Sequence, residues 1–288
     1  MKKFVILICF LPYAALAQNF YLTFKAGLAN YQGELQAHSI TFSQAKFLGS
    51  VGLRYDITEH IAARTAFTLG GLQADDKKGT AGMKARNLNF KTSLFDWEVA
   101  GQYNIFSLND KWWTPYVFAG VSLFHYNPYT KTTAGAKTYL PGLGTEGEGF
   151  TPGVQPYGLW QASIPMGIGF DYALNEDLRV GIEFTYHKLF TDYLDDVSGA
   201  YVDQATLLHA RGQTAVDLAY RGYEVGAGSY PAAGNLRGNP RDKDAWYSFG
   251  ITVTCRSFID QYKRIAGLPA YNRAKKVGCP VGRYNLSF

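Results

Sequence analysis

Four aspartates crowd one short stretch of the sequence, HKLFTDYLDDVSGAYVD at residues 187–203. Clustered carboxylates can bind a metal, perform acid/base chemistry or remain solvated, and oxygen ligands at such spacing suit calcium. The stretch does not follow the EF-hand loop pattern. We therefore predict solvated or helix-capping aspartates, and we assign no metal ligand and no cofactor. The four are Asp192, Asp195, Asp196 and Asp203.

Histidines and serines offer a second possible chemistry. A hydrolase or acyltransferase needs a nucleophile, a base and an orienting carboxylate within hydrogen-bond reach. His125 and His187 lie at the ends of strand-like runs, and Ser122 and Ser163 could lie in reach of His125. No G-x-S-x-G or comparable nucleophile motif accompanies them. We therefore predict no catalytic residue and keep a lipid-modifying enzyme as the least favoured alternative.

The elements that must position these side chains show period-2 alternation of apolar and polar residues, which is typical of strands. In residues 94–106, for example, Phe95 and Trp97 alternate with Asp96 and Glu98. We predict eight strands, at residues 20–30, 46–56, 60–70, 94–106, 116–126, 161–172, 178–188 and 246–254.

Connections between these strands alternate between short and long. Short turns are expected at 58–59, 107–111 and 174–177, and long loops at 31–45, 72–88, 127–157 and 191–244. An even strand number with short turns on one side and long loops on the other is typical of outer-membrane barrels. We predict an all-β fold, an eight-stranded antiparallel up-and-down transmembrane β-barrel with long extracellular loops and a short periplasmic C-terminal tail. A soluble lipocalin-like barrel is the alternative.

Charges on the polar face favour the membrane barrel over the soluble one. Eight strands leave room inside only for side chains, and the four cations and four anions on this face could pair there. The predicted lumen ion-pair network is Lys25, Arg54, Arg64, Asp96, Glu98, Asp171, Arg179 and Glu183. The opposite face carries aromatics expected to form interfacial girdles: Phe20, Trp97, Trp113, Tyr172, Trp246 and Tyr247. A filled lumen argues against a wide porin.

The two ends of the chain differ from the barrel. Residues 1–17 combine two lysines, an apolar run and a small-x-small cleavage pattern, so we predict a secretory signal peptide. The barrel is expected at 18–255 and a periplasmic basic tail at 256–288. The net charge is +5. The sequence has no basic run interleaved with aromatic residues, so it gives no indication of nucleic-acid binding.

The tail carries the features that suggest a protein partner. Cys255 and Cys279 are the cysteines outside the signal peptide, and in an oxidising periplasm they could close a loop worth roughly 3 kcal/mol in the chain-entropy model. One of them could instead cross-link to a partner. The candidate docking residues are Lys263, Arg264, Arg273, Lys275 and Lys276.

Several segments together resemble one known family. FTDYLDDVSGAYVD, directly after LRVGIEFTYHKL, resembles the signature of the PorG-like outer-membrane barrels of Bacteroidota, a component family of the type IX secretion system. GLANYQGEL, GLRYDITEHIAARTAFTLGGLQADD, RNLNF, PYVFAGVSLFHYNP and RGNPRDKDAWYSFGITVT resemble further parts of the same family, in order, over most of residues 20–254. The signature rim loop is Thr191, Asp192, Tyr193, Leu194, Asp195, Asp196, Val197 and Ser198.

This resemblance implies a function without catalysis. It implies an outer-membrane barrel, surrounded by outer-membrane lipids, that contacts the periplasmic ring of the lipoprotein PorK and of PorN and anchors that ring to the membrane. The tail with its cysteine does not match the family pattern. A small adhesion or defence barrel that acts through its outer loops remains the alternative function.

Overall fold

The structure is a computed structural model that describes residues 20–38, 40–256 and 267. The predicted signal peptide, Cys279 and the basic tail residues lie outside the described residues. Among the described helices, none has the length and apolar character needed to cross a membrane.

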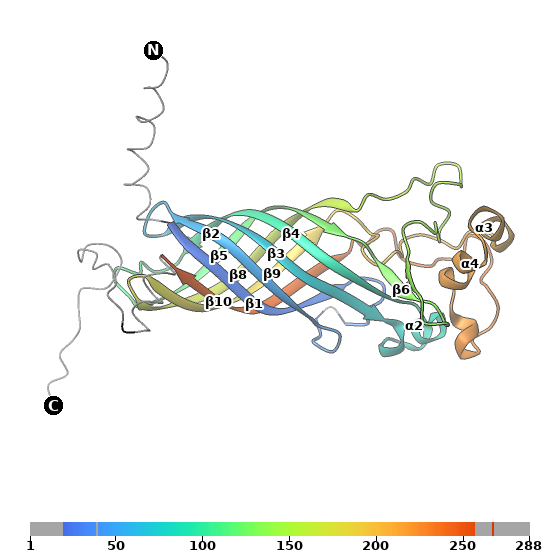
Figure 1. Cartoon of the computed structure of the whole chain (residues 1–288), viewed down its shortest axis with the longest axis horizontal. Helices are drawn as coiled ribbons and strands as arrows, with labels where there is room; N and C mark the ends of the chain where they lie inside the picture. Colours follow the sequence, from blue (N-terminus) through green and yellow to red (C-terminus); the bar gives the residue numbers. More distant parts are fainter. Residues whose placement is uncertain (1–19, 39, 257–266, 268–288) are drawn as a thin grey trace, which may run out of the picture.

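In the described part of the chain, eight long antiparallel strands close into a barrel (Figure 1). Each strand pairs with its neighbour along the chain, and β1 pairs with the last strand. The β3–β4 pairing completes the ring. The barrel strands are β1 (Phe20–Gln32), β2 (Lys46–Asp56), β3 (Ile61–Asp75), β4 (Asn89–Asn104), β5 (Trp113–Tyr126), β8 (Trp160–Asn175), β9 (Leu178–Leu189) and β10 (Ala245–Cys255).

The predicted fold class is confirmed, and all eight predicted strands are present. The alternation of apolar and polar residues predicted where the strands lie, and the range predicted for β2 matches its observed bounds. Strands β3 and β4 extend beyond the predicted runs at their long-loop ends. Two short strands that the sequence did not indicate, β6 (Tyr129–Lys131) and β7 (Lys137–Tyr139), form a hairpin within a long loop.

Apolar side chains cover the outside of the barrel, as a lipid-facing surface requires. Ile168, Val121 and Phe47 are each more than 60% exposed. This orientation excludes the lipocalin-like alternative, whose apolar face would point inward. Four of the six predicted girdle aromatics are also exposed: Phe20, Trp97, Trp113 and Tyr172.

The other two predicted girdle aromatics are buried, so the prediction was wrong for them. Trp246 is 1% exposed and its ring stacks on that of His187, 3.6 Å away, on the lumen side. Tyr247 is 2% exposed because the first long loop folds over it. The Tyr247 hydroxyl donates to the carbonyl of Thr41 and accepts from the Thr41 amide.

The four long loops pack together into a single structure at one end of the barrel, which we call the cap. The cap comprises residues 33–38, 40–45, 76–88, 127–159 and 190–244, and it lies at the right-hand end of Figure 1. Besides β6 and β7 it contains η2 (Asp76–Lys78), α2 (Ala81–Arg86), α3 (Gln204–Arg211), α4 (Gln213–Ala219) and η3 (Gly222–Val225).

A buried apolar core extends from the end of the lumen nearest the cap into the cap itself. It joins strand residues such as Phe90, Phe124 and Trp246 to loop residues such as Leu194 and Leu218. A second cluster, around Leu207 and Val216, packs α3 against α4. The opposite, short-turn end consists of residues 57–60, 105–112 and 176–177, and we call it the turn end.

Candidate functional site

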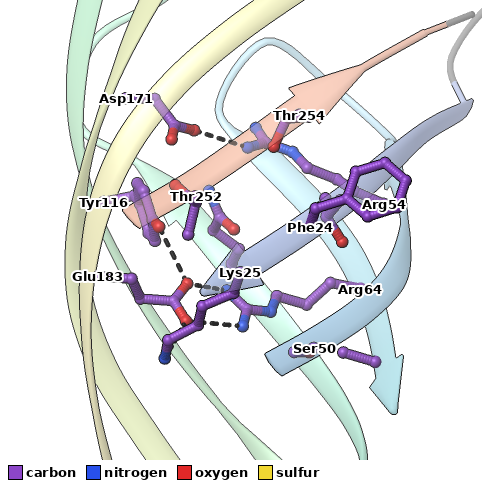
Figure 2. Close-up of a pocket in the computed structure, with 13 residues that line it drawn as sticks. Phe24, Lys25, Ser50, Arg54, Arg64, Tyr116, Asp171, Glu183, Thr252 and Thr254 are labelled. Carbon is purple, nitrogen blue, oxygen red and sulfur yellow. Dashed lines mark hydrogen bonds and ion pairs between the residues drawn. The ribbon is translucent and has the colours of Figure 1, made fainter. Parts of the chain in front are cut away.

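Charged side chains from five strands meet inside the barrel (Figure 2). They surround a cavity of about 40 Å³, which has room for roughly three water molecules. In Figure 2, Asp171 and Glu183 approach this cavity from one wall, and Arg54 and Arg64 approach it from the other. The charged and phenolic groups that line it are Lys25, Arg54, Arg64, Tyr116, Asp171 and Glu183.

Glu183 of β9 is the centre of this arrangement, and its side chain is 3% exposed. One carboxylate oxygen accepts from Lys25 Nζ at 3.0 Å, and the other accepts from Arg64 Nη1 at 2.6 Å. The Tyr116 hydroxyl also donates to Glu183, at 2.9 Å. Arg64 reaches Glu98 at 2.7 Å as well, so four charged groups form one connected network.

Two glycines of β8 make room for the aromatic side chains beside Glu183. A Cβ at Gly169 would overlap the ring of Tyr116, and one at Gly167 would overlap that of Phe118. The aromatic rings of β5 therefore lie directly against the glycine backbone of β8. This packing aims the Tyr116 hydroxyl at the carboxylate.

A second layer of charges lies nearer the turn end. Arg54 pairs with Asp171 at 3.0 Å and with Asp56 at 2.7 Å. Arg179 pairs with Asp56 at 3.0 Å, and its guanidinium lies 4.3 Å from the ring centre of Tyr21. Asp56, the last residue of β2, is not among the residues predicted for the network.

The structure thus brings seven of the eight predicted network residues into ion pairs with one another or with Asp56, and Asp96 is the exception. Asp96 is fully buried, and its nearest ionisable partner is His187, whose Nδ1 lies 3.9 Å from the carboxylate. Ser163 lies 3.4 Å from the same nitrogen and shares a 2.6 Å hydrogen bond with Ser122.

Ser163 therefore contacts His187 and not His125, contrary to expectation, and Ser122 contacts Ser163. His125 lies three residues from Ser122, so the two side chains point to opposite faces of β5. His125 instead packs against Trp160 on the outer face, at 4.9 Å. Asp96 and Ser163 both approach Nδ1 of His187, whereas a proton relay from serine to carboxylate would use the two different ring nitrogens.

The aspartate-rich rim loop lies in the cap and is largely buried, which corrects the prediction of solvated aspartates. Asp192, Asp195 and Asp196 are each 2% exposed or less. Asp203 does cap a helix, because its carboxylate accepts from the Thr206 amide at the start of α3.

Hydrogen bonds hold the buried rim-loop residues in place. Asp196 accepts from the hydroxyls of Thr145 and Tyr157, at 2.7 and 2.6 Å. Asp192 accepts from Ser198 at 2.6 Å, and the Tyr193 amide donates to Thr191 at 3.2 Å. The remaining rim-loop residues pack inward, because Leu194 and Val197 are buried in the apolar core.

Two arginines join distant segments of the cap. The Arg86 guanidinium pairs with Asp76 at 2.8 Å and donates to the carbonyl of Glu34 at 3.0 Å and to that of Arg237 at 2.6 Å. Arg237 pairs with Glu146 at 3.0 Å and lies 3.7 Å from Asp196.

Burial shifts the pKa of several of these cap groups. Burial raises the pKa of Asp196 to about 7, although the Arg237 guanidinium and two hydroxyl donors oppose the shift. Burial also raises the pKa of Asp195, and the negative charge of Glu34 adds to this. The pKa of Arg237 is raised because the charges of Glu146 and Asp196 outweigh its burial.

The segments that carry the family resemblance meet at this network. Glu34, Asp76, Arg86, Asp196 and Arg237 come from five of the six segments, which are spread over 200 residues of sequence. None of the five side chains is predicted from the sequence to form this site. The signal available in the sequence was that each of these five side chains lies in a segment that resembles the same family.

Two groups of described side chains could supply metal ligands. Asp96, Glu98 and His187 form one group in the lumen, and Glu34, Asp192 and Asp244 form another in the cap. In each group, one ligand atom per residue lies within 4.8 Å of the others. In the lumen group, one Glu98 oxygen is already paired with Arg64.

At the turn end, Cys255 ends β10 and is buried. Its pairing with Cys279 stays a prediction, because Cys279 lies outside the described residues. The same holds for the five tail cations.

The comparison with family models agrees with this architecture. A family model described as an outer membrane protein beta-barrel domain matches residues 4–228. Among solved structures, Neisserial surface protein A is 10% identical with a TM-score of 0.42, covering 83% of this chain and 97% of that chain. OprG from Pseudomonas aeruginosa is 9% identical with a TM-score of 0.41, covering 82% and 96%. Ail, the attachment invasion locus protein of Yersinia pestis, is 6% identical with a TM-score of 0.40, covering 82% and 96%. No curated protein matches the chain.

Proposed function

The chain belongs to the outer membrane protein beta-barrel domain family, and on that premise we propose that it is a non-enzymatic component of the type IX protein secretion system. In this proposal the barrel anchors the periplasmic ring, formed by the lipoprotein PorK and by PorN, to the outer membrane. The choice of this system rests on the PorG-like segments of the sequence.

The observation that best supports an anchoring role is the closed interior of the barrel. The cavity beside Glu183 holds only about 40 Å³, and a packed apolar core lies between it and the outside of the cap. A barrel filled with ion pairs and closed by its own loops offers no route for a solute. It is suited to act as a rigid body in the membrane.

The surface available to a periplasmic ring would be the turn end together with the tail. The turns are short, so they offer a small docking area by themselves. The tail continues directly from the end of β10 at Cys255 and carries Lys263, Arg264, Arg273, Lys275 and Lys276. In the proposal these cations bind an acidic face of the ring. A Cys255–Cys279 disulfide would hold the tail against the barrel end.

A charge-matched complementation experiment tests this assignment. A strain that lacks the protein would be complemented with the wild type, with a tail variant or with a cap variant, and secreted cargo would be measured. The tail variant changes the five tail cations to alanine. The cap variant changes five exposed cap cations to alanine: Lys77, Lys84, Lys131, Lys137 and Arg211.

We expect the tail variant to lose cargo secretion and the cap variant to keep it, with both barrels present in the outer membrane at wild-type amounts. Normal secretion by cells that lack the protein would refute the proposal. Loss with the cap variant alone would move the function to the outer surface.

The ordered cap favours one second candidate, a surface adhesion or defence barrel. Its loops have their own apolar cores, so they present a defined surface to the outside. This candidate predicts that the cap variant loses attachment or serum resistance while cargo secretion is unchanged in both variants.

A further inference from the structure

Three carboxylates from different loop ends converge in the cap. Glu34 follows β1, Asp192 follows β9 and Asp244 precedes β10. Strand β10 pairs with both β1 and β9, so the three loop ends are neighbours on the barrel rim. One oxygen from each carboxylate lies within 4.8 Å of the other two.

Two of the carboxylate oxygens in this cluster are buried without a hydrogen-bond partner. Asp192 is 2% exposed, and its Oδ1 has no partner, while Oδ2 accepts from Ser198. Glu34 Oε2 is also buried and without a partner. A buried carboxylate oxygen that has lost its water and gained no donor is costly. Unpartnered buried oxygens on two of three converging carboxylates therefore indicate a ligand that binds them.

The cations nearest in sequence and space are engaged elsewhere. Arg86 directs its guanidinium to Asp76 and to two backbone carbonyls, and the Lys243 ammonium donates to the carbonyl of Pro240. Asp244 accepts from the Tyr31 hydroxyl and the Leu194 amide, and each of its oxygens keeps a second lone pair. Among the described residues, no salt bridge reaches the three carboxylates, and the charges of Arg86 and Lys243 act on Glu34 and Asp192 only from a longer distance.

A glycine next to Glu34 allows the carboxylates of the cluster to come together. A Cβ at Gly33 would overlap both the Tyr31 hydroxyl and Asp244 Oδ1. The residue next to Glu34 therefore has to lack a side chain for the two loop ends to approach.

The donor set selects the class of ion. It consists of carboxylate oxygens, with neither histidine nor cysteine in the group, and hard oxygen ligands suit Ca²⁺ or Mg²⁺ better than zinc or copper. Ca²⁺ accepts irregular geometry and carbonyl or water oxygens as further ligands, whereas Mg²⁺ demands near-ideal octahedral geometry. Ligands from three separate loop ends fit Ca²⁺ better. The long loops of an outer-membrane barrel face the cell exterior.

We propose that Glu34, Asp192 and Asp244 bind one Ca²⁺ ion, which ties the first long loop to both ends of the last one. The site does not depend on the secretion role. The bound ion neutralises the cluster and locks the rim loop against β1 and β10, so calcium outside the cell holds the cap closed.

Binding is tested on the full-length protein, purified in detergent free of lipopolysaccharide and stripped of metal with a chelator. Isothermal titration with Ca²⁺ gives stoichiometry and affinity, and Tb³⁺ luminescence, excited through nearby tyrosines, reports the location. The variants are Asp192→Asn and Glu34→Gln. Asp203→Asn is the matched control, because it removes a carboxylate of the same loop that is exposed and outside the cluster, and asparagine still caps α3.

We expect one Ca²⁺ per chain with a Kd of about 1 mM or tighter, as for extracellular calcium modules. Asp192→Asn and Glu34→Gln should each weaken binding by about tenfold or more, because the charge of the ligand set tunes affinity. Asp203→Asn should bind as the wild type does. If a cluster variant fails to fold, Tb³⁺ bound to the wild type should be displaced by Ca²⁺ at least tenfold more effectively than by Mg²⁺. The proposal would be overturned if the wild type did not bind Ca²⁺ at a concentration tenfold above a Kd of about 1 mM. It would also be overturned if Mg²⁺ displaced Tb³⁺ as effectively as Ca²⁺, or if both cluster variants bound Ca²⁺ with unchanged affinity.

Discussion

Replacing Glu183 with glutamine tests whether ion pairs hold the barrel interior together. The wild-type carboxylate accepts from Lys25, Arg64 and the Tyr116 hydroxyl. The amide of glutamine keeps the size of the side chain but removes its charge. Arg64 retains Glu98 as a partner, so the group that loses its counter-charge is Lys25, whose side chain is 11% exposed.

Removing one partner of a buried ion pair typically costs 3–5 kcal/mol, because the other charge stays buried without compensation. Two features place the cost of Glu183→Gln near the lower end of this range. Lys25 keeps hydrogen bonds to Thr185 and Ser248, and the adjoining cavity of about 40 Å³ can admit water. We expect a loss of about 3 kcal/mol in the free energy of unfolding.

The assay is reversible denaturant unfolding in lipid vesicles, followed by tryptophan fluorescence. Adding Lys25→Met to Glu183→Gln should restore about 1–3 kcal/mol relative to the sum of the single variants, because both partners are then absent. Glu59→Gln makes the same chemical change at an exposed turn position and should stay within about 0.5 kcal/mol. A loss below about 1 kcal/mol for Glu183→Gln, or strict additivity in the double variant, would refute the reasoning.

Three further predictions follow from the lumen and the cap. The purified barrel should show no stable open-channel conductance in planar bilayers, and steady conductance would contradict a filled lumen. The pKa of Asp196 is raised to about 7 from an ordinary 3.8, so its protonated form favours the folded cap. Its contribution is present below about pH 4 and is lost as the pH rises through about 7, by a few kcal/mol at most. Asp196→Asn should flatten this dependence when unfolding is measured at pH 4.5 and pH 8. Asp203→Ala should cost about 1 kcal/mol of local helix stability and speed amide hydrogen exchange in α3, with little change in the barrel strands.

The barrel itself could be predicted because its signal is local. A strand with one face toward lipid and one toward a polar lumen must alternate, and seven of the eight runs show this alternation on their own. The run at residues 116–126 is ambiguous, because both of its faces carry apolar residues. The same parity rule placed Lys25, Arg64 and Glu183 on the inner face. It also separates Ser122 from His125, which the sequence analysis did not apply when it considered the two together.

The cap could not be predicted in the same way, because its contacts join segments that are far apart in the sequence. Burial of Asp196 depends on Arg237, Thr145 and Tyr157, each at least 39 residues away. An aspartate-rich loop considered alone is expected to be solvated. Strand β10 is a related case at the rim. Alternation places Tyr247 on the outer face with Phe249 and Ile251, and Trp246 on the opposite face, but it does not indicate the distant loop residue Thr41 that covers Tyr247.

The most direct test of the proposed anchoring role is recovery of PorK and PorN with the tagged protein from membranes kept oxidised. A second chain, ending after Ser257, keeps all eight barrel strands, because β10 ends at Cys255. We predict that the full-length chain recovers both ring proteins and that the shortened chain recovers far less. Failure of the full-length chain to recover either protein would contradict the account.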